Sequence, residues 1–223
     1  MALSRAAAAA GLLAAALSAG CGSAPPAKGL TPAPPAPARY AISEADVDFM
    51  SGMIPHHAQA IVMAGWAPTR GARSDVAILC ERILVGQRDE IALMQTWLRD
   101  HGLPVPDATA TRHRMKMPNG MEHDMLMPGM LTDEEMAALE RARGPEFDRL
   151  FLEGMIRHHQ GAIDMVDRLF KSYGAAQDET VFKFANDVQA DQSIEIDVMK
   201  DMLAHVGKGA MADFSDSNTK KGH

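Results

Sequence analysis

The sequence predicts an all-α protein: a ferritin-like four-helix bundle built from two duplicated helical hairpins, which a long methionine-rich crossover joins. Two observations predict this fold. An internal repeat links the two halves of the chain at an offset of 102 residues in its first block and 105 residues in its second, and self-similarity of this kind indicates duplicated structural units. Apolar residues also recur at helical spacing in both copies, and the alternating pattern typical of strands is absent from the sequence.

The repeat consists of two blocks. The block Phe-x-x-x-Met-Ile-x-His-His-x-x-Ala-Ile-x-Met occupies residues 49–63 and again residues 151–165. The block Gln-x-x-Glu-Ile-x-x-Met-x-x-x-Leu occupies residues 87–98 and again residues 192–203. Each copy is therefore expected to form a helix, a short connection and a second helix.

In the first copy, Ser43 is predicted to cap a helix that reaches about Trp66. Pro68 and Gly71 mark the end of that helix, because proline and glycine interrupt the helical backbone. The second helix is expected from about Ser74 to His101.

In the second copy, Thr132 and Glu135 have the spacing of a capping box, which predicts a short helix before Gly144. Pro145 fits the first turn of the next long helix, which Gly174 ends. The last helix is expected over residues 178–206.

The two ends of the chain are predicted to lie outside the fold. Residues 1–20 have the basic start and short apolar run of a secretory signal peptide, and the apolar run is too short and too rich in alanine to form a membrane span. Small residues then precede Cys21, which predicts a lipidated cysteine, with ordinary signal cleavage as the alternative. The predicted segments that follow are a proline-rich tether (21–40), the bundle (41–207, with repeats at about 43–102 and 145–207 and the crossover at 103–144), and a disordered tail (208–223).

The charge and the cysteine content limit which partners and which disulfides are expected. The formal net charge of the chain is −7, which makes nucleic acid an unlikely partner and is compatible with cations. The chain has two cysteines. If Cys21 is acylated, Cys80 is alone and no internal disulfide forms.

Histidines interrupt the apolar stripes of the first helix in both copies. These are His56 and His57 in one copy, and His158 and His159 in the other. Glutamates on the second helices, Glu90 and Glu195, also lie among apolar residues, and a buried charge needs a partner. The histidines and glutamates are therefore expected either to pair as structural elements or to bind metal. A di-iron centre of the ferritin type is not expected, because the sequence has no Glu-x-x-His motif.

The crossover concentrates soft ligands. Six of the 17 methionines fall within residues 113–130, where prolines and glycines break any helical period. In a mobile loop, thioethers together with imidazole favour Cu(I). The alternative is that the methionines fill irregular gaps over the bundle. The crossover candidates are Met115, Met117, Met121, His123, Met125, Met127 and Met130.

The doubled His-His block, with Met-Pro-Gly-Met-x-Thr-x-x-Glu-Met ahead of its second copy, resembles the bacterial domain-of-unknown-function family 305. The resemblance covers about residues 46–207. It implies a ferritin-like bundle in exported proteins, some of which bind copper and aid copper tolerance. It also implies metal roles for the matching positions, which are Met53, His56, His57, Met63, Met155, His158, His159 and Met165, with Met127 and Met130 ahead of the second block. Arg157 stands where the first copy has Pro55, and because it places a fixed positive charge beside His158, His158 is expected to be the weaker ligand.

These features predict a lipid-anchored protein on the periplasmic or outer side of a membrane that binds copper as a buffer or delivers it to envelope copper proteins. Cu(I) is expected at the crossover, and Cu(II) is an option at the histidine pairs. No catalytic motif is visible, so an enzyme is not expected. Two alternatives stay open: a metal-dependent oxidase that uses the histidine pairs with the glutamates, and a metal-free interaction module.

Overall fold

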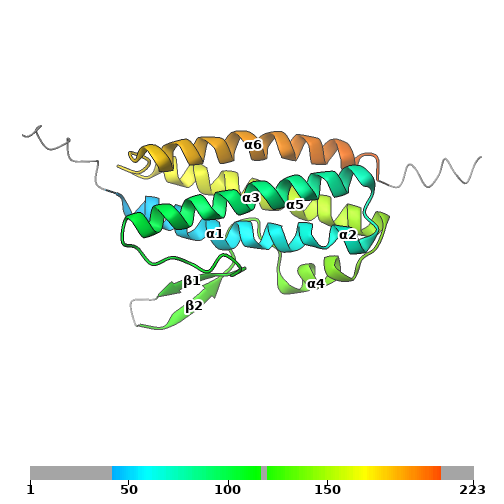
Figure 1. Cartoon of the computed structure of the whole chain (residues 1–223), viewed down its shortest axis with the longest axis horizontal. Helices are drawn as coiled ribbons and strands as arrows, with labels where there is room; N and C mark the ends of the chain where they lie inside the picture. Colours follow the sequence, from blue (N-terminus) through cyan, green and yellow to red (C-terminus); the bar gives the residue numbers. More distant parts are fainter. Residues whose placement is uncertain (1–41, 117–119, 207–223) are drawn as a thin grey trace, which may run out of the picture. The chain divides into compact units, whose positions relative to one another are not determined.

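The computed structural model describes residues 42–116 and 120–206, and this part of the chain is mainly α-helical, which confirms the all-α class. Four long helices lie side by side (Figure 1). They are α1 (Glu44–Gly65), α3 (Ser74–Asp100), α5 (Pro145–Lys171) and α6 (Glu179–Leu203). Two short helices, α2 (Ala67–Arg70) and α4 (Asp133–Arg141), precede α3 and α5. The ferritin-like connectivity stays a prediction.

The helix starts follow the predicted caps. Ser43 caps α1 in a capping box with Asp46, and Thr132 caps α4 in the same way with Glu135. These side chains satisfy backbone N–H groups that the first helical turn leaves unpaired. Asp178 accepts hydrogen bonds from two backbone N–H groups at the start of α6. The capping signals in the sequence therefore place these three starts to within a residue.

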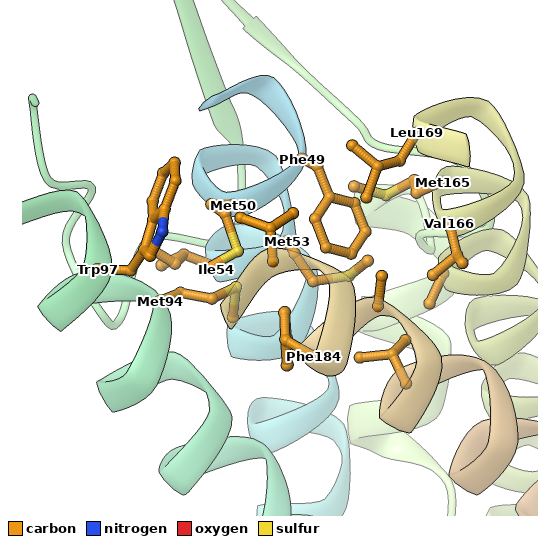
Figure 2. Close-up of a cluster of buried hydrophobic side chains, with 14 of the residues drawn as sticks. Phe49, Met50, Met53, Ile54, Met94, Trp97, Met165, Val166, Leu169 and Phe184 are labelled. Carbon is orange, nitrogen blue, oxygen red and sulfur yellow. The ribbon is translucent and has the colours of Figure 1, made fainter. Parts of the chain in front are cut away.

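Each hairpin packs on itself, and the two hairpins meet through their first helices. α1 packs along α3, α5 packs along α6, and α1 also packs against α5. Two clusters of buried side chains hold this arrangement, and all four long helices contribute to both clusters. Figure 2 shows the cluster that contains Phe49, Met94, Met165 and Phe184. Each cluster therefore contains residues of both hairpins, so neither hairpin has a core of its own.

The crossover contains a small β-hairpin, so the expectation of no strands was wrong. β1 (His113–Lys116) pairs antiparallel with β2 (Glu122–Met125). Strands of four residues are too short to produce a recognisable alternating pattern, and an isolated two-stranded hairpin is marginal in water. Contacts between β1 and α1 supply the support that the local sequence lacks.

Several predictions fall on residues outside the described part. These are the signal peptide, Cys21, the tether, Met117 and the C-terminal tail. Within residues 42–116 and 120–206, no helix is long and apolar enough to cross a membrane.

Candidate metal centre

The two histidine pairs lie at the contact between α1 and α5. All four side chains are completely buried. The rings of His56 and His158 meet there, with centroids 3.8 Å apart and ring planes inclined by 40°. The ring centroids of His57 and His159 each lie 6.2 Å from the ring centroid of the preceding histidine in the same helix. The packing thus brings the His-His blocks of both copies to one place in the interior.

The outer histidine of each pair binds a glutamate of the neighbouring helix. Nε2 of His57 lies 2.6 Å from Oε2 of Glu90, and Nε2 of His159 lies 2.7 Å from Oε2 of Glu195. The side chains of Glu90 and Glu195 are 25% and 19% exposed to solvent. The expected pairing across each hairpin is therefore confirmed, and it joins α1 to α3 and α5 to α6.

The inner histidines bind backbone carbonyls. Nε2 of His56 lies 2.9 Å from the carbonyl oxygen of Pro128, and Nε2 of His158 lies 3.0 Å from the carbonyl oxygen of His56. A carbonyl only accepts hydrogen bonds, so Nε2 carries the proton in both rings. In the neutral rings, Nδ1 then carries a lone pair.

The Nδ1 atoms of all four histidines are buried and lack a hydrogen-bond partner within the described residues. This arrangement matches that of metal-binding histidines, in which one ring nitrogen ligates while the other donates to a carboxylate or a carbonyl. The histidines are therefore oriented as ligands are, although they also serve as structural contacts.

Burial keeps the inner histidines uncharged. Burial, reinforced by the neighbouring His57, lowers the pKa of His56 to about 3. Burial and the contact with His56 also hold the pKa of His158 well below its usual range. Imidazole must be neutral to bind a metal ion, so protons do not compete for these two rings near neutral pH.

The imidazoles and carboxylates do not by themselves complete a metal site. Among residues 42–116 and 120–206, no three histidine, cysteine, aspartate or glutamate side chains are close enough together to hold a metal ion. Cys80 is buried, and burial, with Asp148 as the next cause, raises the pKa of its thiol to about 12. Cys80 is therefore a protonated core residue at neutral pH, so further ligands would have to come from methionine.

The methionines of the repeated block differ in their surroundings. Met53, Met63 and Met155 are completely buried in the two core clusters. Met165 is 5% exposed and lines a cavity of about 550 Å³ at one side of α1 and α5. Only Met165 of these four reaches a solvent-connected space.

The crossover is more ordered than the sequence predicts. Gln59 of α1 donates to the carbonyl oxygen of Leu131 at 2.9 Å and accepts from its N–H at 2.8 Å. Met130 is buried, and its sulfur accepts a hydrogen bond from the backbone N–H of Met127. The expectation of a mobile loop is therefore wrong for the segment that ends at Leu131, because buried polar groups of α1 fix its backbone.

The remaining crossover candidates are spread over the hairpin. Met121, His123 and Met125 are exposed, and Met127 is half-buried. Met115 lies in β1, and its side chain is outside the described part of the chain. Met125 and Met127 line the same cavity as Met165, whereas Met121, His123 and Met130 do not.

The cavity also contains two residues that the sequence did not single out as ligands, His113 and Asp48. Burial lowers the pKa of His113, and the Asp48 carboxylate opposes this shift. Burial raises the pKa of Asp48, with Glu44 as the next cause. The signal for His113 was its place beside the methionine cluster, but only the pairing of β1 with β2 brings it opposite Met125.

Arg157 does not act on His158 as expected. Its guanidinium forms two hydrogen bonds of 2.7 Å with the carboxylate of Glu135 at the surface. His158 is completely buried. The charge of Arg157 is thus balanced by Glu135 at the surface. Arg157 therefore gives no reason to expect weaker metal binding by His158.

Comparison with known proteins gives one family and several solved structures. The family model "Domain of unknown function (DUF305)" matches residues 46–203. No curated protein matches the chain. A DUF305 protein of Streptomyces coelicolor is 28% identical, with a TM-score of 0.61 over 73% of this chain and 94% of the other. A DUF305 fragment of Deinococcus radiodurans is 27% identical, with a TM-score of 0.60 over 74% of this chain and 98% of the other.

The protein CopM is also similar, and it has been solved with bound metal. Its Cu(II)-bound form is 31% identical, with a TM-score of 0.55 over 72% of this chain and 96% of CopM. Its Cu(I)-bound form is 28% identical, with the same TM-score and coverage. A silver-bound form of CopM is also known.

Proposed function

Since the chain belongs to the DUF305 family, we propose that it is an exported envelope protein that binds copper for buffering, tolerance or delivery. The observation that carries this proposal is the group of thioethers at one cavity, to which Met125 and Met127 of the crossover and Met165 of α5 contribute. The four buried Nδ1 atoms that lack a hydrogen-bond partner among the described residues are a second observation in its favour. A buried polar atom left unpaired costs about 1–3 kcal/mol. A metal ion bound to one or two of these nitrogens would remove that cost for them. Its remaining ligands would come from other residue types, because no three histidine, cysteine, aspartate or glutamate side chains of the described residues lie close enough together.

The preference for Cu(I) is proposed from the chemistry of the crossover. Thioether sulfur is a soft ligand that favours Cu(I), whereas imidazole binds copper in either oxidation state. We therefore assign Cu(I) to the methionines, and Cu(II) or structural pairing to His56, His57, His158 and His159 with Glu90 and Glu195. The Cu(I), Cu(II) and silver forms of CopM, at 28–31% identity, support copper binding by this chain.

A metal-free interaction module is the second candidate, and a specific observation favours it. The hydrogen bonds from His57 and His159 to glutamates join the helices of each hairpin without any metal. Met53, Met63 and Met155 are likewise packed as core residues. The oxidase alternative has less support, because it needs carboxylates and imidazoles around one ion and the described residues contain no such group of three.

The cellular place of the protein is part of the proposal. We propose that Cys21 is lipidated and holds the domain at a membrane through the tether. The Streptomyces coelicolor relative, which is described as secreted, supports export. Replacing Cys21 with serine should move the protein from the membrane fraction to the soluble fraction, and equal solubility of both forms would contradict the anchor.

The proposed function is tested by titrating Cu(I) under reducing conditions against a chromophoric chelator. Wild type is compared with a variant in which the six crossover methionines are leucine. Leucine keeps the apolar volume and removes the sulfur, so the fold should tolerate the change. We expect tight Cu(I) binding by wild type and a large loss in the variant at pH 7.5 and at pH 5.5, because thioethers do not titrate. Equal affinities at both pH values would show that the methionines are packing residues.

A further inference from the structure

The repeat places a glycine at the same position in the first helix of each copy, Gly52 in α1 and Gly154 in α5. A Cβ atom at Gly52 would lie 2.8 Å from Cε of Met127 and 3.6 Å from Cε of Met165. A Cβ atom at Gly154 would lie 3.1 Å from a methyl group of Leu131 and 3.3 Å from Cε of Met63. Each glycine therefore forms a notch that receives one methionine of the opposite helix and one residue of the crossover.

The two notches hold equivalent methionines but different crossover residues. Met63 and Met165 occupy the same position in the repeat. The notch of Gly52 adds Met127, so it contains two thioethers, whereas the notch of Gly154 adds Leu131 and contains one. The duplicated position thus has an additional sulfur atom in one copy only.

The notches also differ in their access to solvent. Met127 and Met165 both line the cavity of about 550 Å³. Met63 and Leu131 are 0% and 3% exposed and belong to the second core cluster. The Gly52 notch therefore borders a solvent-connected cavity, whereas the Gly154 notch is closed by packing.

The β-hairpin brings two more ligands to the open notch. His113 of β1 and Met125 of β2 are directly paired residues of the antiparallel ladder, and such partners have Cβ atoms about 4.5–5.5 Å apart. Both line the cavity, together with the carboxylate of Asp48 and the guanidinium of Arg168. Three thioethers and one imidazole, from α5, β1, β2 and the segment after β2, therefore border one space.

We propose that this cavity is the Cu(I) site of the protein, with Met127 and Met165 as the central ligands and with His113 and Met125 as the ligands from the hairpin. The inference rests on the proposed copper-binding function and names the residues that carry it. Cu(I) favours such a set because thioethers are soft and imidazole completes the coordination without adding charge. The Gly154 notch has kept its methionine as a core residue and binds no metal.

The repeat supplies a matched control for the experiment. The variant M127L/M165L removes the two sulfurs of the open notch, and M63L/M155L removes two completely buried sulfurs of the same repeated block. Since removing even an indirect support of a metal ligand costs about 10–100-fold in affinity, the loss of two ligands should weaken Cu(I) binding by more than about 100-fold in M127L/M165L. The control M63L/M155L should keep the wild-type affinity to within a few-fold. H113Q and M125L should each give an intermediate loss.

Thermal melting of the metal-free variants checks that both pairs are folded. If M127L/M165L melts well below the control, the single variants H113Q and M125L carry the test, because these hairpin residues lie outside the core clusters. Tight Cu(I) binding by wild type that M127L/M165L retains, or that M63L/M155L loses to the same extent, would overturn this site and leave the copper function standing. Absence of Cu(I) binding by wild type would instead overturn the proposed function.

Discussion

The two copies of the repeat differ most where they meet the crossover. Gln59 in the first copy and Gly161 in the second occupy the same position. The Gln59 side chain forms two hydrogen bonds with the backbone of Leu131. At Gly161, by contrast, an added Cβ would lie 1.9 Å from the carbonyl oxygen of Pro128. α1 therefore binds the crossover through the side chain of Gln59. α5 leaves room for the crossover backbone because Gly161 has no side chain.

This difference shows which parts of the duplication remained symmetrical. The bonds from His57 to Glu90 and from His159 to Glu195 occur in both copies with nearly equal lengths. The inner histidines diverge, because His56 binds the crossover and His158 binds α1. The contacts inside each hairpin are thus alike in both copies, while the positions that face the single crossover differ between them.

The largest expected effect is a loss of folding stability at low pH, which follows from the lowered pKa that His56 and His158 share. The pKa values of His56 and His158 lie below that of an unfolded histidine, so the unfolded chain takes up protons that the folded protein cannot. The folding stability that these rings contribute is complete above about pH 6.5 and is lost as the pH falls towards 3. At pH 5 the expected loss is about 2 kcal/mol for His56, and the lowered pKa of His158 adds a further loss in the same direction.

Urea unfolding of the metal-free protein at pH 7 and at pH 5 measures this loss. An NMR titration of the two imidazoles assigns it, since both rings should remain neutral at pH 5. Equal stability at the two pH values, or protonated rings in the folded protein, would show that the interior accepts the charge.

The next largest effect is expected for Gly161→Ala. The new methyl group would meet the backbone at Pro128, which cannot move aside as a flexible side chain can. We expect the variant to lose about 3 kcal/mol of stability. Gly86→Ala is the control, because nothing lies within 4 Å of its Cβ position in α3, and it should gain about 0.5–1 kcal/mol. Denaturant unfolding measures both, and a neutral Gly161→Ala would contradict the close approach of the crossover.

A smaller loss is expected for Gln59→Ala. The substitution leaves the N–H and the carbonyl of Leu131 without their partner in a buried place, which costs about 2 kcal/mol. Gln160→Ala serves as the comparison, because its amide bonds only the exposed Asp164, and it should change stability by less than about 0.5 kcal/mol. If the two variants unfold at the same denaturant concentration, Gln59 does not fasten the crossover.

The smallest effect is expected when metal is removed. Core clusters that span all four long helices should keep the domain folded without copper. Far-UV circular dichroism should therefore give the same helix content before and after chelation, and the melting temperature should rise with added copper only by mass action. A large loss of helix in the chelated protein would mean that metal is needed for folding.

The sequence predicted the helices well because their signals are local. Ser43, Thr132 and Asp178 satisfy the first turns of their own helices, so their effect can be read from a few neighbouring residues. The pairing of His57 with Glu90 was also predictable, since two polar residues on facing apolar stripes need each other. The repeat strengthened both predictions by showing each pattern twice.

The cavity could not be predicted in the same way. The role of His113 depends on its pairing with Met125 in a hairpin whose strands have four residues each. The different environments of Met63 and Met165 depend on which crossover residue fills each glycine notch. These are contacts between distant segments, and the repeated pattern, which has methionine at both positions, does not distinguish them.

The central claim is that thioether sulfur binds the copper. X-ray absorption spectroscopy of the protein loaded with one equivalent of Cu(I) tests it most directly, because sulfur and nitrogen scatter differently in the first coordination shell. We predict a shell of mainly sulfur with one nitrogen ligand in wild type, and a large decrease of the sulfur contribution in M127L/M165L, which keeps only Met125, but no decrease in M63L/M155L. A first shell of nitrogen and oxygen alone in wild type would place the copper at the histidine pairs or at carboxylates, and would contradict the account.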